Sequence, residues 1–170
     1  MKLFKYFSSL SLIIILVTGL VVTTQAQESY TAHNDGWMVS VEKAQAVSAE
    51  TGKPIMANFT GSDWCGWCKR LTANVFSKPE FKKWADENVV LLELDFPRRT
   101  QLPEEIQQQN YSLQKAFKVT GYPTVWIFYL EQNTDTDQMN IKALGRTGYK
   151  NSVKEFTDDV DQMIAEKADS

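Results

Sequence analysis

The 170-residue sequence predicts an α/β domain in which helices flank a central mixed β-sheet, with one further helix before the first strand. Two apolar runs, Ile55 to Phe59 and Val89 to Leu94, have the length and boundaries of buried strands, and helical sequence lies between them. Such a βαβ unit makes its strands parallel through a right-handed crossover. Two later strands, Thr124 to Leu130 and Asn140 to Leu144, form a hairpin, so the sheet is expected to be mixed.

The first 26 residues have the pattern of a secretory signal peptide. Lys2 and Lys5 give a positive start, Leu10 to Val22 is apolar, and Thr24-Gln25-Ala26 offers small residues at a cleavage site. The apolar stretch is shorter than the roughly 20 residues of a membrane-spanning helix. We therefore expect cleavage after Ala26, a periplasmic or secreted protein, and no stable membrane insertion of the mature chain.

The mature chain is expected to comprise a linker over residues 27–36, a folded domain over residues 37–166 and a tail over residues 167–170. In the domain, Val39 to Glu50 shows a loose helical stripe that stops before Gly52.

Helical spacing of apolar residues also marks Gly66 to Val75, which places Cys65 at or just before a first helical turn. Ser77-Lys78-Pro79-Glu80 has the pattern of a capping box that opens the next helix. Pro103 to Phe117 is a Gln-rich helical stretch in which Asn110 marks a candidate break.

The C-terminal part contains a long polar hairpin loop, Glu131 to Gln138, and a last helix. Asn151 or Ser152, followed by Glu155, is expected to cap that helix. Its inward side is expected to carry Val153, Phe156, Val160 and Ile164.

The charge of the mature chain argues against nucleic acid as a partner. Removal of Lys2 and Lys5 leaves 16 basic and 21 acidic residues and changes the net charge from −3 to −5. The basic residues form only small pairs such as Lys69-Arg70 and Arg98-Arg99, whereas a protein that binds polyanions presents a basic face.

The two cysteines, in Trp64-Cys65-Gly66-Trp67-Cys68, are spaced for redox chemistry rather than for a structural disulfide. A structural bridge stabilises mainly by closing a long loop of the unfolded chain, and this spacing closes almost none. Residues three apart share a helix face, so the sulfurs can bond without a large backbone movement. Because a helix N-terminus favours the thiolate, Cys65 is the expected attacking thiol and Cys68 the resolving thiol.

Other uses of these cysteines are less well supported. A structural zinc site needs about four ligands, and Cys65, Cys68 and His33 are too few. Covalent haem attachment needs a His where the chain has Lys69. A cysteine hydrolase needs a His base, and His33 is near the mature N-terminus without a motif around it. We expect no metal or other cofactor, and we expect His33 to be exposed or to cap a helix.

The sequence resembles the thioredoxin superfamily over about Trp37 to Ala165. Three features carry the resemblance: the strand that leads into Trp64-Cys65-Gly66-Trp67-Cys68-Lys69, the strand that ends at Asp95, and Gly121-Tyr122-Pro123-Thr124 before the next strand. The resemblance implies the thioredoxin fold.

Within the superfamily, Gly52-Lys53-Pro54 and Phe59 to Cys65 are similar to exported bacterial thioredoxin-like proteins. This likeness implies a cis Tyr122–Pro123 bond beside the cysteines, with the backbone of Tyr122 receiving an extended substrate peptide. The alternative is an ordinary trans proline at the start of a strand.

The sequence departs from the family pattern in the strand before the cysteines. Thioredoxins usually carry a buried Asp there, thought to relay the proton of the resolving cysteine, and Asn58 stands at the matching position. An amide cannot take that proton. The loop to Cys65 is one residue longer, so Asp63 is a second candidate relay, although a loop Asp is more simply a solvated or capping residue.

A second departure is Gly66-Trp67 between the cysteines, where reductases of the family often have Gly-Pro and oxidants and isomerases often have His. Without an imidazole, the Cys65 thiolate is expected to be less stabilised than in strong oxidants, which favours a reductase or isomerase. An apolar rim of Trp64 and Trp67 is expected to receive peptides, with partial burial of Trp64 as the alternative. The expected substrate-binding residues are Trp64, Gly66, Trp67, Tyr122 and Pro123. Packing is the expected role of Trp37, Trp84 and Trp126.

The sequence therefore predicts a thiol–disulfide oxidoreductase of the cell envelope that reduces or isomerises disulfides in exported, cysteine-containing proteins. A membrane or periplasmic thiol donor would restore its dithiol. The alternative is a thioredoxin-fold peptide-binding or chaperone module in which the Cys65–Cys68 disulfide stays closed.

Overall fold

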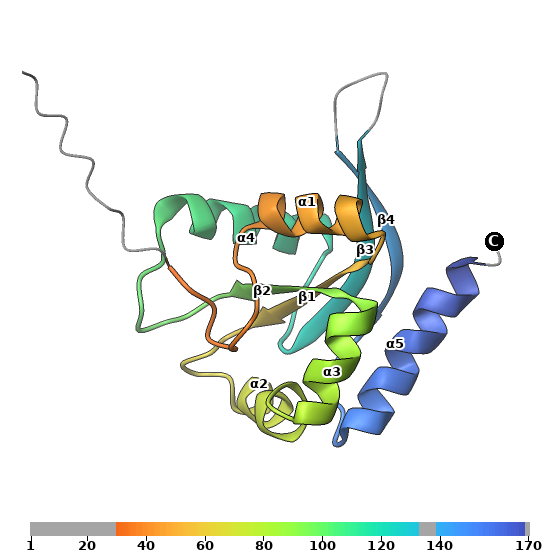
Figure 1. Cartoon of the computed structure of the whole chain (residues 1–170). Helices are drawn as coiled ribbons and strands as arrows, with labels where there is room; N and C mark the ends of the chain where they lie inside the picture. The colour runs from red at the N-terminus through yellow and green to blue at the C-terminus, as the bar shows by residue number, and fades with distance from the viewer. Residues whose placement is uncertain (1–29, 133–138, 169–170) are drawn as a thin grey trace, which may run out of the picture.

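A four-stranded sheet in the order β2-β1-β3-β4 lies between two layers of helices in the computed structural model, which describes residues 30–132 and 139–168 (Figure 1). β1 (Ile55–Thr60) runs parallel to β2 (Val90–Asp95) and antiparallel to β3 (Thr124–Gln132). β4 (Met139–Thr147) pairs antiparallel with β3. The predicted mixed sheet is confirmed. The predicted signal peptide and residues 133–138 of the predicted hairpin loop lie outside the described residues.

Helices cover both faces of this sheet (Figure 1). One face carries α1 (Val41–Thr51) and α4 (Glu104–Ala116). The opposite face carries α2 (Gly66–Leu71), the π-helical turn η1 (Thr72–Phe76), α3 (Pro79–Asn88) and α5 (Val153–Ala168). Within residues 30–132 and 139–168, no helix has the length and apolar character needed to cross a membrane.

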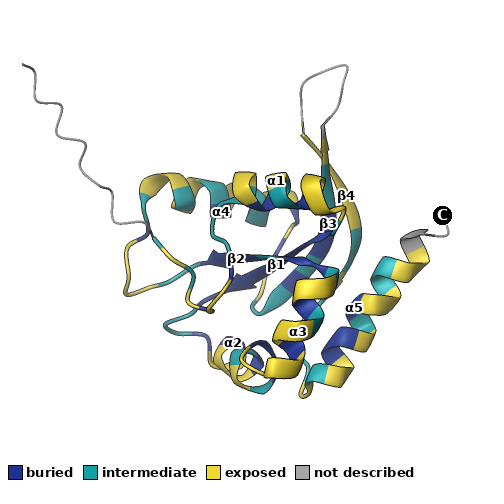
Figure 2. Ribbon diagram, viewed as in Figure 1, coloured by how far each residue is buried: buried dark blue, intermediate teal, exposed yellow. Residues whose placement is uncertain are grey.

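β1 is buried along its whole length because both helical layers cover it (Figure 2). Met56 belongs to the core beneath α2, α3 and α5, whereas Ile55, Ala57 and Phe59 belong to the core beneath α1 and α4. A strand that is buried on both faces is mainly apolar along its length, so its sequence does not show the alternation of apolar and polar residues typical of a half-exposed strand.

The core beneath α3 and α5 is built around Phe81, which is fully buried. Its ring centroid lies 5.0 Å from that of Phe76, 5.9 Å from Phe156 and 6.4 Å from Trp37. Trp37 is 7% exposed, which confirms its packing role. Trp84 and Trp126 are partly buried and pack against the two cores.

The expected capping box at Ser77 is wrong. The backbone of Ser77 is still helical, because η1 extends the preceding helix to Phe76. An N-cap residue needs an extended backbone, which Lys78 provides instead, directly before Pro79. The Ser77 hydroxyl donates back to the Ala73 carbonyl at 3.2 Å.

The expected break at Asn110 is also wrong, since α4 is continuous through it. The Asn110 side chain is buried, and its Nδ2 donates to the carbonyl of Asp95 at 2.9 Å. Because its amide is satisfied by this tertiary bond, it does not compete for the helix backbone.

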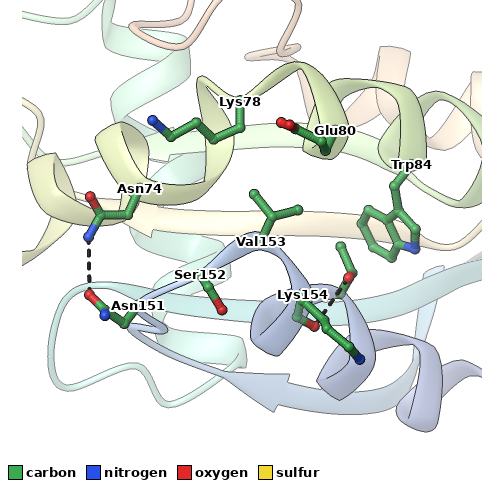
Figure 3. A pocket seen from close by; sticks show the side chains of 9 residues that line it. Asn74, Lys78, Glu80, Trp84, Asn151, Ser152, Val153 and Lys154 are labelled. Carbon is green, nitrogen blue, oxygen red and sulfur yellow. Dashed lines mark hydrogen bonds between the residues drawn. The ribbon is translucent and has the colours of Figure 1, made fainter.

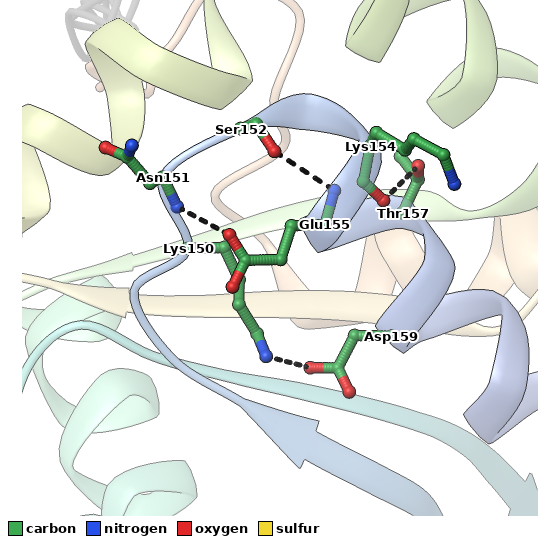
Figure 4. Close-up of polar contacts among 7 residues, drawn as sticks. All are labelled: Lys150, Asn151, Ser152, Lys154, Glu155, Thr157 and Asp159. Atoms are coloured by element: carbon green, nitrogen blue, oxygen red, sulfur yellow. Dashed lines mark hydrogen bonds and ion pairs between the residues drawn. The ribbon is translucent and has the colours of Figure 1, made fainter.

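The start of α5 matches the expected cap (Figure 4). The Ser152 hydroxyl accepts the backbone N–H of Glu155 at 3.2 Å, and the Glu155 carboxylate accepts the backbone N–H of Asn151 at 3.3 Å. Lys150 pairs with Asp159 at 3.2 Å beside this cap. The helix then continues to Ala168, into the segment expected to be the tail.

A buried carboxylate attaches the N-terminal segment to the sheet. Glu93 is 1% exposed and accepts the backbone N–H groups of His33 and Asn34 as well as the Asn34 side-chain amide. Met38 bridges to Leu92 on the outer edge of β2. The His33 side chain is exposed, as expected. Part of the expected linker is therefore held against β2.

Phe81→Ala should lower the free energy of unfolding by about 3–5 kcal/mol, because it removes a fully buried ring and leaves a cavity. The matched control is Tyr111→Ala, at an aromatic that is 56% exposed, which should cost less than about 1 kcal/mol. Urea unfolding of both variants tests this, and equal losses would contradict the proposed core.

Burial raises the pKa of Glu93, and the charge of Asp95 adds to this effect, although the N–H bonds from His33 and Asn34 oppose it. Its native pKa therefore lies above the value of about 4.3 in the unfolded chain. The protonated form contributes stability that is present below that pH and is lost as the pH rises through the native pKa.

Glu93→Gln removes this titration, so the unfolding free energy of the wild type relative to the variant should fall as the pH rises from about 4 to 7. Urea unfolding across that range measures the difference. Glu87→Gln, on the exposed side of α3, is the control for a lost surface charge. A wild-type advantage that grows with pH would refute the assignment.

Candidate active site

The end of β1 and the start of α2 place the two cysteines at one edge of the sheet. Cys65 is the N-cap of α2 and has an extended backbone, and Cys68 lies in the first turn. They form a disulfide with Cα atoms 5.3 Å apart. The backbone N–H of Cys68 donates to the Cys65 sulfur at 3.2 Å.

Exposure does not distinguish the two cysteines, since they are 6% and 4% exposed. Their positions relative to the helix do. The Cys65 sulfur receives a backbone N–H at the positive end of the α2 dipole, and both features favour a thiolate there. Cys68 lies within the helix. This geometry fits Cys65 as the attacking thiol.

The loop that carries the cysteines is cross-linked to the loop after β2. Asp95 accepts both the backbone N–H of Ser62 at 2.8 Å and the Ser62 hydroxyl. In the reverse direction, the carboxylate of Asp63 accepts the N–H groups of Arg98 at 3.0 Å and Arg99 at 2.6 Å. The position of Cys65 is therefore fixed by β2 as well as by β1.

The Tyr122–Pro123 peptide bond is cis and directly precedes β3. Because Thr124 pairs with Phe59 near the end of β1, this bond lies at the same sheet edge as the cysteine loop. The Tyr122 ring meets the Trp64 ring edge-on, with centroids 5.8 Å apart.

Trp64 is half-buried and held from several sides. Its Nε1 donates to the Phe96 carbonyl at 2.8 Å, and the Arg98 guanidinium lies 3.8 Å from its ring centroid. Gly61 lies so close that a Cβ there would be 2.5 Å from the indole. Trp64 is thus part of the scaffold, as the alternative interpretation held.

Trp67, in contrast, is 53% exposed and projects beside the disulfide. Its ring and the Tyr149 ring meet in an edge-to-face arrangement with centroids 4.9 Å apart, and the Arg70 guanidinium lies 4.6 Å from the Trp67 centroid. Gly66 is exposed as well. Of the two tryptophans in the motif, Trp67 offers the larger accessible apolar surface to a peptide.

Neither candidate for the proton relay is placed as a ready base. Asn58 is 2% exposed and faces Glu93 in the β1–β2 register, and its Oδ1 has no hydrogen-bond partner among the residues that the structure describes. Desolvation opposes ionisation of Asp63, but N–H bonds from Arg98, Arg99 and Thr100 outweigh it and lower the pKa of its carboxyl. Asp63 is engaged as an anchor for the loop after β2.

Figure 3 shows a groove of about 780 Å³ on the face of the sheet that carries α2. It lies between η1, α3 and the start of α5. Asn74 donates to Tyr149 at 3.1 Å and to Asn151 at 3.3 Å, so Tyr149 connects the groove to Trp67. The groove is lined by Asn74, Lys78, Glu80, Trp84, Asn151, Ser152, Val153, Lys154 and Thr157.

Sequence reasoning did not find Arg98, Tyr149 and Glu93 as neighbours of the site or its supports. Arg98 stands out only as half of a basic pair, and Glu93 only as a charge within an apolar strand. Nothing in the spacing of Tyr149 relates it to Trp67.

Gly61→Ala should lower the unfolding free energy by about 1–3 kcal/mol, because the new methyl group overlaps the Trp64 ring and forces it to move. Gly66→Ala is the matched control, since a Cβ there meets no atom within 4 Å. Urea unfolding and tryptophan fluorescence would measure both. An unchanged Gly61→Ala variant would show that Trp64 is not fixed by this contact.

Sequence comparison relates the chain to known thioredoxin-like proteins. The model of the thioredoxin-like family matches residues 36–129. The disulfide bond reductase DsbH of Chlamydia pneumoniae is 35% identical over 115 residues, which cover 68% of this chain and 69% of that protein. The thioredoxin-related protein DsbJ of the same organism is 29% identical over 65% of this chain, but the match covers only 32% of its own length.

Two solved structures are similar to the fold of this chain. A structure of DsbH oxidoreductase superposes with a TM-score of 0.67 at 31% identity and covers 79% of this chain and 87% of its own. A thioredoxin from Thermus thermophilus shares the fold with a TM-score of 0.54 at 18% identity, over 73% of this chain and 83% of its own. The helix-capped cysteine pair, the adjoining cis-proline and these likenesses together show that the chain belongs to the thioredoxin-like family.

Proposed function

We propose that this protein is a thiol–disulfide oxidoreductase that reduces or isomerises disulfides in exported proteins. The observation that carries the proposal is the Cys65 sulfur at the N-terminus of α2, where it accepts the Cys68 N–H beside the cis Tyr122–Pro123 bond. The similarity to a protein named a disulfide bond reductase supports the direction of the reaction.

The reduced protein would act in two exchange steps. In the first, the Cys65 thiolate attacks one sulfur of a substrate disulfide, forms a Cys65–substrate disulfide and expels the other substrate sulfur as a thiolate. In the second, deprotonated Cys68 attacks the Cys65 sulfur and releases the remaining substrate thiolate. The substrate gains two electrons and, after protonation, two protons, and the Cys65–Cys68 disulfide is left.

Isomerisation shares the first step and replaces the attack by Cys68 with an attack by a second substrate thiolate on the substrate sulfur of the mixed disulfide. If a different substrate thiolate attacks the mixed disulfide before Cys68 does, the substrate leaves with a rearranged disulfide and the Cys65 thiolate is regenerated. The competition between that thiolate and Cys68 decides between the two outcomes.

Substrate binding is proposed to use the surface around the disulfide. An extended substrate segment would lie along the backbone of Tyr122 and Pro123, and its neighbouring residues would contact Gly66 and the exposed face of Trp67. Trp64 would contribute the edge that its partial burial leaves accessible.

The reduction cycle also needs an electron source. Because each turnover leaves a Cys65–Cys68 disulfide, a second dithiol protein must reduce it, and we propose a membrane or periplasmic thiol donor. This assignment, like an exported location after loss of residues 1–26, rests on the signal-like sequence at the N-terminus.

The competing function is a peptide-binding module in which the disulfide stays closed. The exposed Trp67 would serve such a module equally well. The two functions differ in whether Cys65 must cycle.

Reduction of insulin by dithiothreitol should be accelerated by the wild type, and Cys65→Ser should lower that acceleration by about 100-fold or more because the attacking thiolate is lost. Ser77→Ala, which removes only the hydroxyl bond from Ser77 to the Ala73 carbonyl, is the control. Absence of any acceleration by the wild type would favour the closed-disulfide module.

Cys68→Ala should capture substrates as stable mixed disulfides, since the thiol that releases them is absent. Non-reducing electrophoresis after expression with the native leader would detect these adducts, and the Cys65→Ser/Cys68→Ala variant is the control. If adducts form equally in both variants, Cys65 is not the attacking thiol.

A further inference from the structure

Both tryptophans of the motif carry an arginine on the ring. The guanidinium of Arg98 lies 3.8 Å from the Trp64 centroid, and that of Arg70 lies 4.6 Å from the Trp67 centroid. The two arginines come from different elements, Arg70 from α2 and Arg98 from the loop after β2. Arg98 therefore stands beside Trp64, which precedes Cys65, and Arg70 stands beside Trp67, which precedes Cys68.

These arginines are free to bind a partner. Both are exposed, and within residues 30–132 and 139–168 no carboxylate forms an ion pair with either guanidinium. A guanidinium that stacks on a ring uses its face and leaves its N–H edge available to a carboxylate, often through two hydrogen bonds. Asp63, the acidic side chain that binds the loop after β2, accepts the backbone N–H groups of Arg98 and Arg99.

The two side chains are also pre-positioned. Asp63 holds the backbone of Arg98 while Trp64 holds its side chain, and the helix holds Arg70 beside Trp67. Ordering a long cationic side chain on binding costs free energy, and the ring contacts reduce that cost here. Lys69 and Arg99 are exposed neighbours that add positive charge to the same rim.

The positive charge of this rim, which comprises Lys69, Arg70, Arg98 and Arg99, contrasts with the net negative charge of the whole chain. We infer that Arg70 and Arg98 select substrates in which Asp or Glu flank the disulfide to be attacked. The partner is an acidic polypeptide segment of an exported protein, bound across the Cys65–Cys68 pair. The inference rests on the proposed function and adds a substrate class to it.

The test uses three disulfide-linked peptides that are identical except for acidic, neutral or lysine residues beside the cysteines. The reduced wild type should reduce the acidic peptide about tenfold faster in kcat/KM than the lysine peptide at low salt, and added salt should shrink the ratio. Equal rates for the three peptides would overturn the inference.

Arg70→Gln and Arg98→Gln should each lower the ratio by about threefold, whereas Lys43→Gln, which removes a cation from α1 on the opposite face of the sheet, should leave it unchanged. Arg70→Glu combined with Arg98→Glu should reverse the preference toward the lysine peptide. A ratio that survives this charge reversal would exclude these arginines as the selecting residues.

Binding separates this inference from the proposed function. The oxidised protein, mixed with alkylated acidic peptide that cannot exchange disulfides, should show a change in tryptophan fluorescence that Arg70→Gln and Arg98→Gln weaken. If this binding occurs but no peptide is reduced, the proposed reduction is wrong and the docking surface stands. If peptides are reduced without charge preference or arginine-dependent binding, the docking surface is wrong and the reduction stands.

Discussion

Burial of β1 on both faces is the constraint on which the rest of the site depends. The helices α1 and α4 cover one face of β1, and α3 and α5 cover the other. The chain becomes accessible only beyond the end of this strand, where Gly61 to Trp64 lead into α2. That turn makes Cys65 an N-cap rather than a helix residue, and the same geometry brings β3 and the cis Tyr122–Pro123 bond alongside. The position of the cysteine pair therefore follows from where β1 ends and β3 begins.

The loop around the cysteines is rigid because two carboxylates cross-link it in opposite directions. Asp95 at the end of β2 holds Ser62, and Asp63 in the cysteine loop holds the backbone of Arg98 and Arg99. These bonds fix the position of Cys65 at the helix terminus, so the proposed thiol–disulfide exchange would require little reorganisation of the loop. The same cross-links fix Arg98 over Trp64, which joins the stability of the loop to the charge around the site.

Much of this architecture could be predicted from the sequence, because apolar runs and helical spacing are local signals. The strands, the helix after Cys65 and the Ser152 cap all follow from residues close together in the chain. The errors share a different cause. Ser77 failed as a cap because η1 runs past the predicted end at Val75 to Phe76 and leaves the Ser77 backbone helical, and Asn110 failed as a break because its amide bonds to Asp95, which is distant in sequence. Contacts between distant segments leave no periodic trace, so Arg98, Tyr149 and Glu93 were not predicted.

Asn58, which stands where thioredoxins usually carry an Asp, faces a buried acidic residue of the neighbouring strand. Across the β1–β2 register, Asn58 faces Glu93, whose pKa burial raises. Two buried carboxylates at these facing positions would repel each other in a region of low dielectric constant, and one of them would have to stay protonated. With Glu93 committed to holding His33 and Asn34, a neutral side chain at position 58 avoids that repulsion. An amide at position 58 is therefore compatible with the buried Glu93 that anchors the N-terminal segment on β2.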